Sequence, residues 1–153
     1  MRALESKVPP VAAAFLAALL MWLVSRALPA FAFEFPWCEV VAIGLGTVGV
    51  VISSLGVLSF RRAGTTVNPI KPGSTTSLVA SGVYGMSRNP MYLGFLLLLA
   101  AWAVFLSSAP AFLLLPAFAI FIDRFQIVPE ERALSAIFGP DFVAYKARVR
   151  RWV

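Results

Sequence analysis

The stretch VVAIGLGTVGVVISSLGVLSF, residues 40–60, contains 21 residues and no charged side chain. A helix rises about 1.5 Å per residue, so one of this length crosses the roughly 30 Å hydrocarbon core of a bilayer. The stretch therefore predicts a transmembrane helix.

The same stretch contains GLGTVG, residues 44–49, which matches the glycine pattern of dinucleotide-binding folds. That pattern needs a preceding strand and an acid about 20 residues later, but no acid occurs between Glu39 and Asp123. We interpret the small residues as packing positions instead. Because small residues let helices approach closely, we expect a second helix to lie on the face that carries Gly46, Gly49, Ser53 and Gly56.

Three further apolar blocks cover residues 8–28, 90–106 and 110–122, and the turn Ser107–Pro110 between the last two predicts a tight helical hairpin. A secretory signal peptide is the alternative interpretation of the first block. No convincing small-residue cleavage site follows it, and further spans do, which favours a membrane span.

The composition agrees with a membrane protein, since 60% of the 153 residues are hydrophobic and 13% are charged. Soluble domains are nearer half apolar and a quarter charged. The sequence predicts one all-α polytopic membrane domain with about four transmembrane helices. Residues 1–60 would form two scaffold spans, and residues 61–153 would supply a binding loop, the hairpin and a cytoplasmic amphipathic helix.

Basic residues favour one side of the membrane. Arg26, with the acids Glu34 and Glu39, lies on one predicted side, and nearly all other bases lie on the opposite side. By the positive-inside rule, both termini and the loop 61–89 are cytoplasmic. The net charge of +6 is mostly this topology signal, with attraction to anionic lipid a secondary effect, and the spread of the bases disfavours nucleic-acid binding.

The chain has one cysteine, Cys38, and no histidine. An intrachain disulfide is therefore excluded, and the most common general base and metal ligand is missing. This inventory excludes a zinc site with histidine ligands, a Ser-His-Asp triad and a Cys-His pair. We expect no metal.

The polar segment before the third span carries the densest functional pattern, GVYGMSRNPMYLG, residues 82–94. Pro90 suits the first turn of a helix and Asn89 the N-cap position before it. A helix start of this kind offers free N–H groups to an anion. The alternative is a purely interfacial helix start, with Arg88 reaching to the membrane surface and the tyrosines in an aromatic belt.

The segment after the fourth span contains Pro129, Glu130 and Glu131, which fit the first turn of a new helix, where the dipole favours acids. Gly139-Pro140 predicts the end of that helix, and a second amphipathic piece follows. An interfacial helix with a basic tail explains the tail. It explains less well the two adjacent acids beside the membrane.

Together these motifs resemble the isoprenylcysteine carboxyl methyltransferase family, and the pattern extends into the related phospholipid methyltransferases. The likeness covers roughly residues 64–152, and the first two spans match only as hydrophobic helices. It implies a membrane enzyme that uses S-adenosyl-L-methionine in a cytoplasmic-side pocket. The motifs that carry the resemblance are LVxSGVY, RNPMYLG and EExxLxxxFGxxFxxYxxxV, which begin at Leu78, Arg88 and Glu130.

The resemblance also implies the binding residues. Those in the loop would contact the cofactor, those around the start of the third span would cradle it, and Glu130 would hold a polar group such as its ribose or ammonium. The loop residues are Thr76, Ser77, Leu78, Val79 and Tyr84, and the cradle residues are Asn89, Pro90, Met91 and Tyr92.

Two positions depart from the eukaryotic pattern. Asn89 stands where that pattern has histidine, and Gln126 stands where it has an arginine thought to meet the substrate carboxylate. Arg124 lies close by, so Arg124 and Gln126 are the candidates for substrate positioning. Methyl transfer to a carboxylate needs no general base, because the acceptor is already ionised, and proximity and water exclusion supply most of the rate.

The predicted function is therefore methyl transfer from S-adenosyl-L-methionine to a lipophilic or prenylated acceptor, such as an isoprenylcysteine carboxylate, within the lipid bilayer. Two alternatives stay open at this point. Membrane sterol and enone reductases have a similar C-terminal hairpin but bind NADPH, and a non-catalytic membrane adaptor needs no cofactor.

Overall fold

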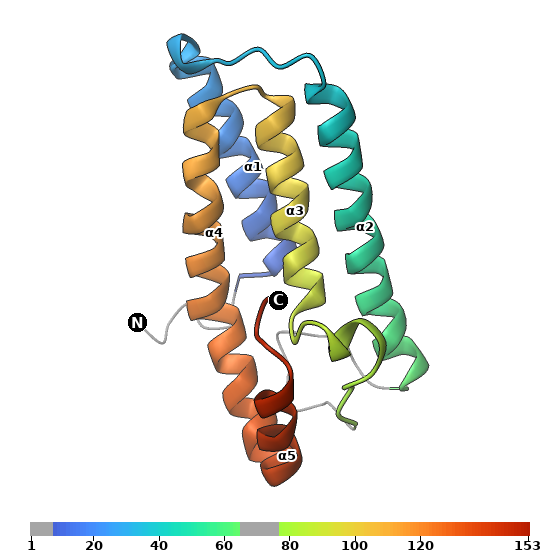
Figure 1. The fold of residues 1–153 in the computed structure, drawn as a ribbon. Helices are drawn as coiled ribbons and strands as arrows, with labels where there is room; N and C mark the ends of the chain where they lie inside the picture. The colour runs from blue at the N-terminus through green and yellow to red at the C-terminus, as the bar shows by residue number, and fades with distance from the viewer. Residues whose placement is uncertain (1–7, 65–76) are drawn as a thin grey trace.

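The computed structural model describes residues 8–64 and 77–153, and these residues form helices with no β-strand. Long helices that run side by side dominate the molecule (Figure 1). In chain order the elements are α1 (Pro10–Ala27), η2 (Pro29–Phe31), α2 (Cys38–Arg62), η4 (Gly82–Gly85), α3 (Pro90–Phe105), η5 (Ala109–Leu113), α4 (Leu114–Ile122), the π-helical turn η6 (Asp123–Ile127) and α5 (Val128–Arg148).

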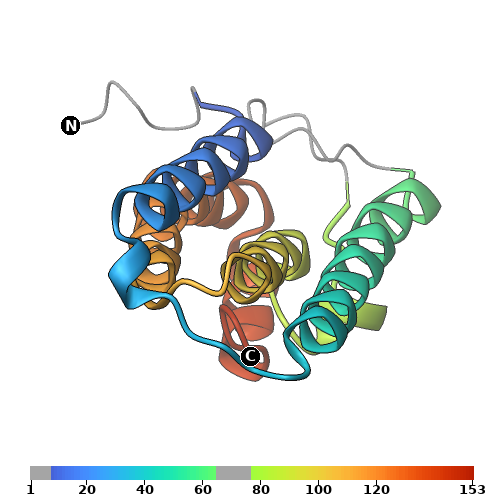
Figure 2. The ribbon, with the colours of Figure 1, turned by 90° about the horizontal axis from the view of Figure 1, so that it is seen from above.

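The expected polytopic all-α architecture is confirmed. Within the described ranges, three helical stretches are long and apolar enough to cross a membrane: α1, α2 and the continuous helix Ala109–Arg148. The fourth apolar helix, α3, has 16 residues and lies inside the bundle. Viewed along the bundle, α3 stands between α2 on one side and α1 and α4 on the other (Figure 2).

Close packing joins α2 to α3, as the small residues of α2 predict. A Cβ atom at Gly49 would lie 2.8 Å from the carbonyl oxygen of Gly94, and one at Gly56 would lie 2.7 Å from Cγ of Met91. A Cβ atom at Gly94 would collide with Ser53, whose hydroxyl donates to the Met91 carbonyl at 3.4 Å. The glycines therefore bring two backbones together, and the dinucleotide interpretation is excluded because no strand precedes them.

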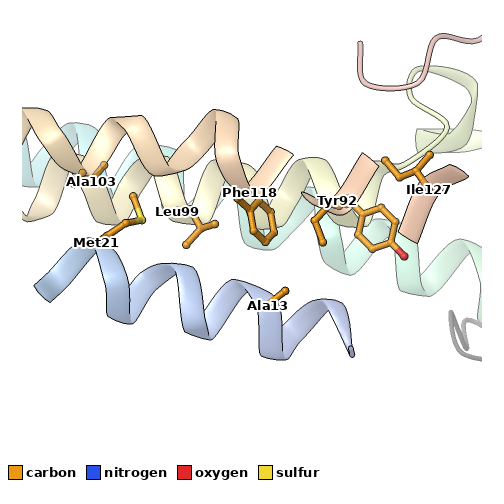
Figure 3. Close-up of a cluster of buried hydrophobic side chains, with 9 residues drawn as sticks. Ala13, Met21, Tyr92, Leu99, Ala103, Phe118 and Ile127 are labelled. Atoms are coloured by element: carbon orange, nitrogen blue, oxygen red, sulfur yellow. The ribbon is translucent and has the colours of Figure 1, made fainter. Parts of the chain in front are cut away.

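Larger side chains fill the space between α1, α3 and α4. Met21, Ala103 and Ile122 are completely buried there, and Leu99 and Phe118 lie beside them. Figure 3 shows Tyr92 at the end of this cluster, next to Ile127, with its hydroxyl pointing away from the apolar side chains. The apolar core thus ends at a polar group.

The two arms of the hairpin are joined as expected by the turn at Ser107–Pro110. Ser107 takes a left-handed backbone conformation, with φ of 50°, and its carbonyl accepts from the N–H of Phe33 at 2.9 Å. The loop after α1 is therefore held against the turn at this end of the bundle.

The sequence suggested that a new helix starts at Pro129, but η5, α4, η6 and the first part of α5 form one continuous helix up to the kink at Gly139. In a regular α-helix the Pro129 ring would clash with the carbonyl of Phe125. The π-helical turn, which occupies 123–127 directly before Pro129, widens the helix at that point. Since the helix is continuous, a helix N-terminus is not what favours the two acids.

The predicted break at Gly139-Pro140 is confirmed. Gly139 has φ of 48°, which a residue with a side chain rarely adopts, and the helix kinks there. Six of the 21 residues of α5 are charged, so α5 lies beyond the apolar part of the long helix Ala109–Arg148.

Candidate functional site

Tyr92 and Glu130 meet where the apolar core ends. The Tyr92 hydroxyl donates to Oε1 of Glu130 at 2.5 Å, and Tyr92 is buried. Tyr92 lies in the first turn of α3, and Glu130 lies in the first turn of α5 after the π-helical turn. Two cradle residues that the sequence placed 38 positions apart are therefore in direct contact.

The Glu130 carboxyl group has an unusual acidity. Burial raises its pKa from 4.5 to about 7; the hydrogen bond from Tyr92 opposes this shift and the nearby Glu131 adds to it. Burial penalises the charged form of a carboxyl group unless a positive charge or donors compensate it. Glu130 is therefore suited to a ligand that carries a positive charge or hydroxyl donors.

A cluster of four charged side chains, Arg88, Asp123, Glu131 and Arg151, lies next to this pair. Arg88 Nη2 contacts Glu131 Oε1 at 2.8 Å, and the side chains of these two residues are each 11% exposed. Arg151 contacts Glu131 Oε2 at 2.7 Å and Asp123 Oδ1 at 2.8 Å. The hydrogen bond to Glu131 is the main reason that the pKa of Arg151 is raised.

The charged cluster was missed from the sequence. The alternative in which Arg88 reaches to the membrane surface is wrong, because its guanidinium contacts Glu131 and the Lys146 carbonyl. Only the adjacency of Glu130 and Glu131 signalled that a polar site was present. The partners lie 20 to 43 positions apart in the sequence, too far for any local pattern.

Asn89 is the N-cap residue of α3, as predicted. Its side chain makes no capping hydrogen bond and instead donates to the Arg151 carbonyl at 2.9 Å. Its backbone N–H donates to the Ser87 hydroxyl at 3.1 Å. Pro90 does occupy the first turn of α3, as predicted.

The loop before α3 packs on the second half of α5. Tyr84 is buried, its carbonyl accepts from the Tyr145 hydroxyl at 2.7 Å, and its ring meets the Phe60 ring edge-on at 5.1 Å. Burial raises the pKa of Tyr84 above its ordinary value, and the charge on Glu130 adds to the shift. Tyr84 therefore joins the loop before α3 to both α2 and α5.

The remaining candidate residues of the loop lie near the contact between this loop and α5 or near the end of α2. Leu78 packs against the cluster formed by Phe142, Tyr145 and Val149, while Val79 is buried. Ser77 donates to the Ala63 carbonyl at 3.2 Å, which ties the loop to the end of α2. Thr76 lies outside the described residues.

The two candidates for substrate positioning lie in different environments. Gln126 is 1% exposed; its Nε2 donates to the Val8 carbonyl at 2.7 Å, and its Oε1 is buried with no hydrogen-bond partner. Arg124 is exposed on another face of the helix. Arg124 therefore does not share the position of Gln126.

The available groups suit an organic ligand. Among residues 8–64 and 77–153, no group of three or more Cys, Asp or Glu side chains is arranged to hold a metal ion. Two buried polar atoms in this part of the chain have no partner and belong to site residues: the acceptor Gln126 Oε1 and the donor Arg88 Nε. Such atoms are costly to bury unless a ligand or solvent meets them.

The sequence profile of the phospholipid methyltransferase family matches residues 37–141, about two thirds of the chain. The chain belongs to the phospholipid methyltransferase family. The matched region starts before the motifs described above and contains the whole of α2, α3 and α4. It also contains both members of the Tyr92–Glu130 pair.

Two similar sequences extend the comparison. An uncharacterized protein of Haemophilus influenzae is 43% identical over 63 residues, which are 41% of this chain and the whole of that protein. Protein-S-isoprenylcysteine O-methyltransferase B of Arabidopsis thaliana is 28% identical over 116 residues, 74% of this chain and 57% of that enzyme. The chain thus spans little more than half the length of the plant enzyme. No solved structure matches.

Proposed function

We propose that this family member transfers a methyl group from S-adenosyl-L-methionine to a lipophilic acceptor at the membrane surface. The observation that carries the proposal is the buried Tyr92–Glu130 pair, placed where the apolar core ends in a chain of the phospholipid methyltransferase family. The pair combines a carboxylate with an apolar surface, which a cofactor with a charged and an aromatic part requires.

The residues present fit that cofactor. Its charged end carries an ammonium and a carboxylate, and its ribose carries two hydroxyl groups. Glu130 would accept from the ammonium or the ribose, and the unpartnered Gln126 Oε1 and Arg88 Nε offer a further acceptor and donor. Within this proposal Ser77, Leu78, Val79 and Tyr84 line the same site, with Asn89, Pro90 and Met91 at its rim; Thr76 stays a prediction.

When bound, the cofactor supplies an electrophilic methyl group on a sulfonium. The protein's own residues bind and orient the two reactants and exclude water from them. The apolar side chains around Tyr92 would keep water from the reacting groups, and the packed segments that carry Tyr92 and Glu130 would hold the two reactants close together. A carboxylate acceptor needs no general base, which suits a chain without histidine.

The acceptor in this proposal is a carboxylate of the isoprenylcysteine kind or another lipophilic nucleophile, reached from the bilayer. The name of the plant relative supports the carboxylate, and the family's name supports a phospholipid. The site would face the cytoplasm, since the bases of the charged cluster and of α5 gather at its end. In this scheme residues 1–60 form the scaffold, and residues 61–153 form the reactive part.

Calorimetry of the purified protein in detergent tests the proposed cofactor. We expect S-adenosylhomocysteine, the demethylated product, to bind at one site per chain and NADP to give no heat of binding. Binding of NADP without binding of S-adenosylhomocysteine would overturn the proposal in favour of a reductase. Binding of neither would favour an adaptor without a cofactor.

A further inference from the structure

The segment after α5, residues 149–152, returns to the start of α3; we call it the strap. The N–H of Arg88 donates to the Arg150 carbonyl at 3.0 Å, and Asn89 Nδ2 donates to the Arg151 carbonyl at 2.9 Å. Figure 1 shows this segment rising from α5 toward the middle of the bundle. The strap therefore joins α5 to the loop that leads into α3. It lies beyond the region of the family match, which ends at residue 141.

Arg151 gives the strap its polar anchor. Its Nη2 and Nε contact the two oxygens of Glu131 at 2.7 and 3.2 Å, and its Nη1 contacts Asp123 at 2.8 Å. A planar guanidinium that binds a carboxylate with two N–H groups fixes its orientation as well as its distance. One side chain thus holds the π-helical turn and the first turn of α5 together.

These contacts surround the Tyr92–Glu130 pair. The backbone carbonyl of Arg151 accepts from Asn89, which lies three residues before Tyr92. The guanidinium of Arg151 binds Glu131, which is next to Glu130. The two members of the pair meet only while the start of α3 and the start of α5 keep their spacing. Arg151 contacts both starts, and together with the Arg88–Glu131 ion pair it holds that spacing.

We propose that Arg151 is a positioning residue: it orients the Tyr92–Glu130 pair for the cofactor, and the strap completes the site. This inference rests on the proposed function above. Arg151 acts through Glu131 and Asn89 and not by touching the cofactor.

The strap has other anchors besides Arg151. Val149 is buried against Phe142 and Tyr145, and Trp152 packs on the main core. Loss of the guanidinium alone should therefore leave the strap in place and loosen only the polar contacts. The effect of a substitution at Arg151 on cofactor binding can then be measured in protein that is still folded.

The test compares three variants by calorimetry with S-adenosylhomocysteine, which reports the dissociation constant and the fraction of active protein separately. In Arg151→Met, Asp123 loses its ion pair with Arg151 and Glu131 keeps only its ion pair with Arg88. Arg151→Lys keeps the charge but loses the planar fork. Arg150→Met is the matched control, because Arg150 is the exposed neighbour and the change in net charge is the same.

We expect Arg151→Met to raise the dissociation constant roughly tenfold without lowering the active fraction, because a misoriented Glu130 would lose the strength of about one charged hydrogen bond to the cofactor. Arg151→Lys should recover part of that loss, and Arg150→Met should bind as the wild type does. A merely structural role would instead lower the active fraction and leave the dissociation constant unchanged.

Equal dissociation constants for the wild type, Arg151→Met and Arg150→Met would overturn the positioning role while the proposed function stands. A lower active fraction at an unchanged dissociation constant would overturn it in the same way. A wild type that binds no S-adenosylhomocysteine would overturn the proposed function and, with it, the role of Arg151.

Discussion

The α2–α3 interface and the Tyr92–Glu130 site are held together by opposite means. At the interface, glycines at positions 49, 56 and 94 let two backbones touch without any charged group. At the site, a carboxyl–hydroxyl pair and a cluster of four charged side chains join segments that are far apart in the sequence. The comparison teaches that the scaffold depends on shape, whereas the site depends on polar partners.

The largest effect is expected where the scaffold allows no extra atom. Gly94→Val places a Cβ atom against Ser53 and against the Gly49 carbonyl oxygen, at 2.6 Å from the latter. We expect the free energy of unfolding to fall by about 4 kcal/mol, because α2 and α3 must separate. Denaturation in detergent measures this loss.

Gly44→Val is the matched control for that variant. Gly44 lies on the partner helix α2, which is also apolar, but a Cβ atom there meets nothing within 4 Å. We expect a change within about 0.5 kcal/mol, as for other surface substitutions. Equal losses for the two variants would show that close packing on α3 is not what holds α2.

A somewhat smaller loss is expected in the charged cluster. Glu131→Ala leaves Arg88, whose side chain is 11% exposed, without its carboxylate partner. Removal of one member of a buried ion pair costs about 3 kcal/mol. Asp141→Ala, an exposed acid on the same helix, should change the unfolding free energy little. Equal free energies of unfolding for the two variants would show that the ion pairs of Glu131 do not stabilise the fold.

Tyr92→Phe should separate binding from stability. It removes the hydroxyl that donates to Glu130 and keeps the ring in the apolar core. We expect S-adenosylhomocysteine to bind roughly tenfold more weakly, since Glu130 loses the donor that orients it. Unchanged affinity, measured by calorimetry, would mean that the pair is not the binding site.

The smallest effect is a dependence of binding on pH. The pKa of Glu130 is raised to about 7, so the charged fraction of this group increases as pH rises through neutrality. If the charged form binds the ammonium group, affinity should increase about threefold between pH 6.5 and 7.5, in proportion to that fraction. Glu130→Gln should abolish the dependence; its persistence there would assign the titration to another group.

The same raised pKa affects the protein without ligand, with the opposite sign. A carboxyl group whose pKa is higher in the folded state is stabilised there in its protonated form. Its contribution to the free energy of unfolding is therefore lost as pH rises from 4.5 to about 7. Ligand binding and folding thus respond to Glu130 in opposite directions.

The sequence predicted the scaffold well because its signals are local. The uncharged run 40–60 and the helical spacing of Gly46, Gly49 and Gly56 each lie within one helix, and α3 does pack on that face. The turn at Ser107–Pro110 and the break at Gly139 are local signals too, and both are confirmed.

The site was only partly predictable because its contacts are not local. Tyr92 and Glu130 were chosen through the family resemblance, and their contact joins positions 38 apart. Asn89 is the N-cap residue of α3, as its local pattern predicted, but its side chain donates to a carbonyl 62 positions away, which no local pattern could predict. Pro129 signalled a helix start, but a π-helical turn accommodates it within a continuous helix.

The most direct test of the account is a methyl-transfer assay with radiolabelled S-adenosyl-L-methionine and membrane lipid extract. The assay compares the wild type with Glu130→Gln and with Glu34→Gln, a change of an exposed acid outside the site. The account predicts labelled lipid from the wild type and from Glu34→Gln, and a loss of roughly a hundredfold for Glu130→Gln. Equal labelling by all three proteins would contradict the assignment of the site, and no labelling by any of them would contradict methyl transfer to lipid.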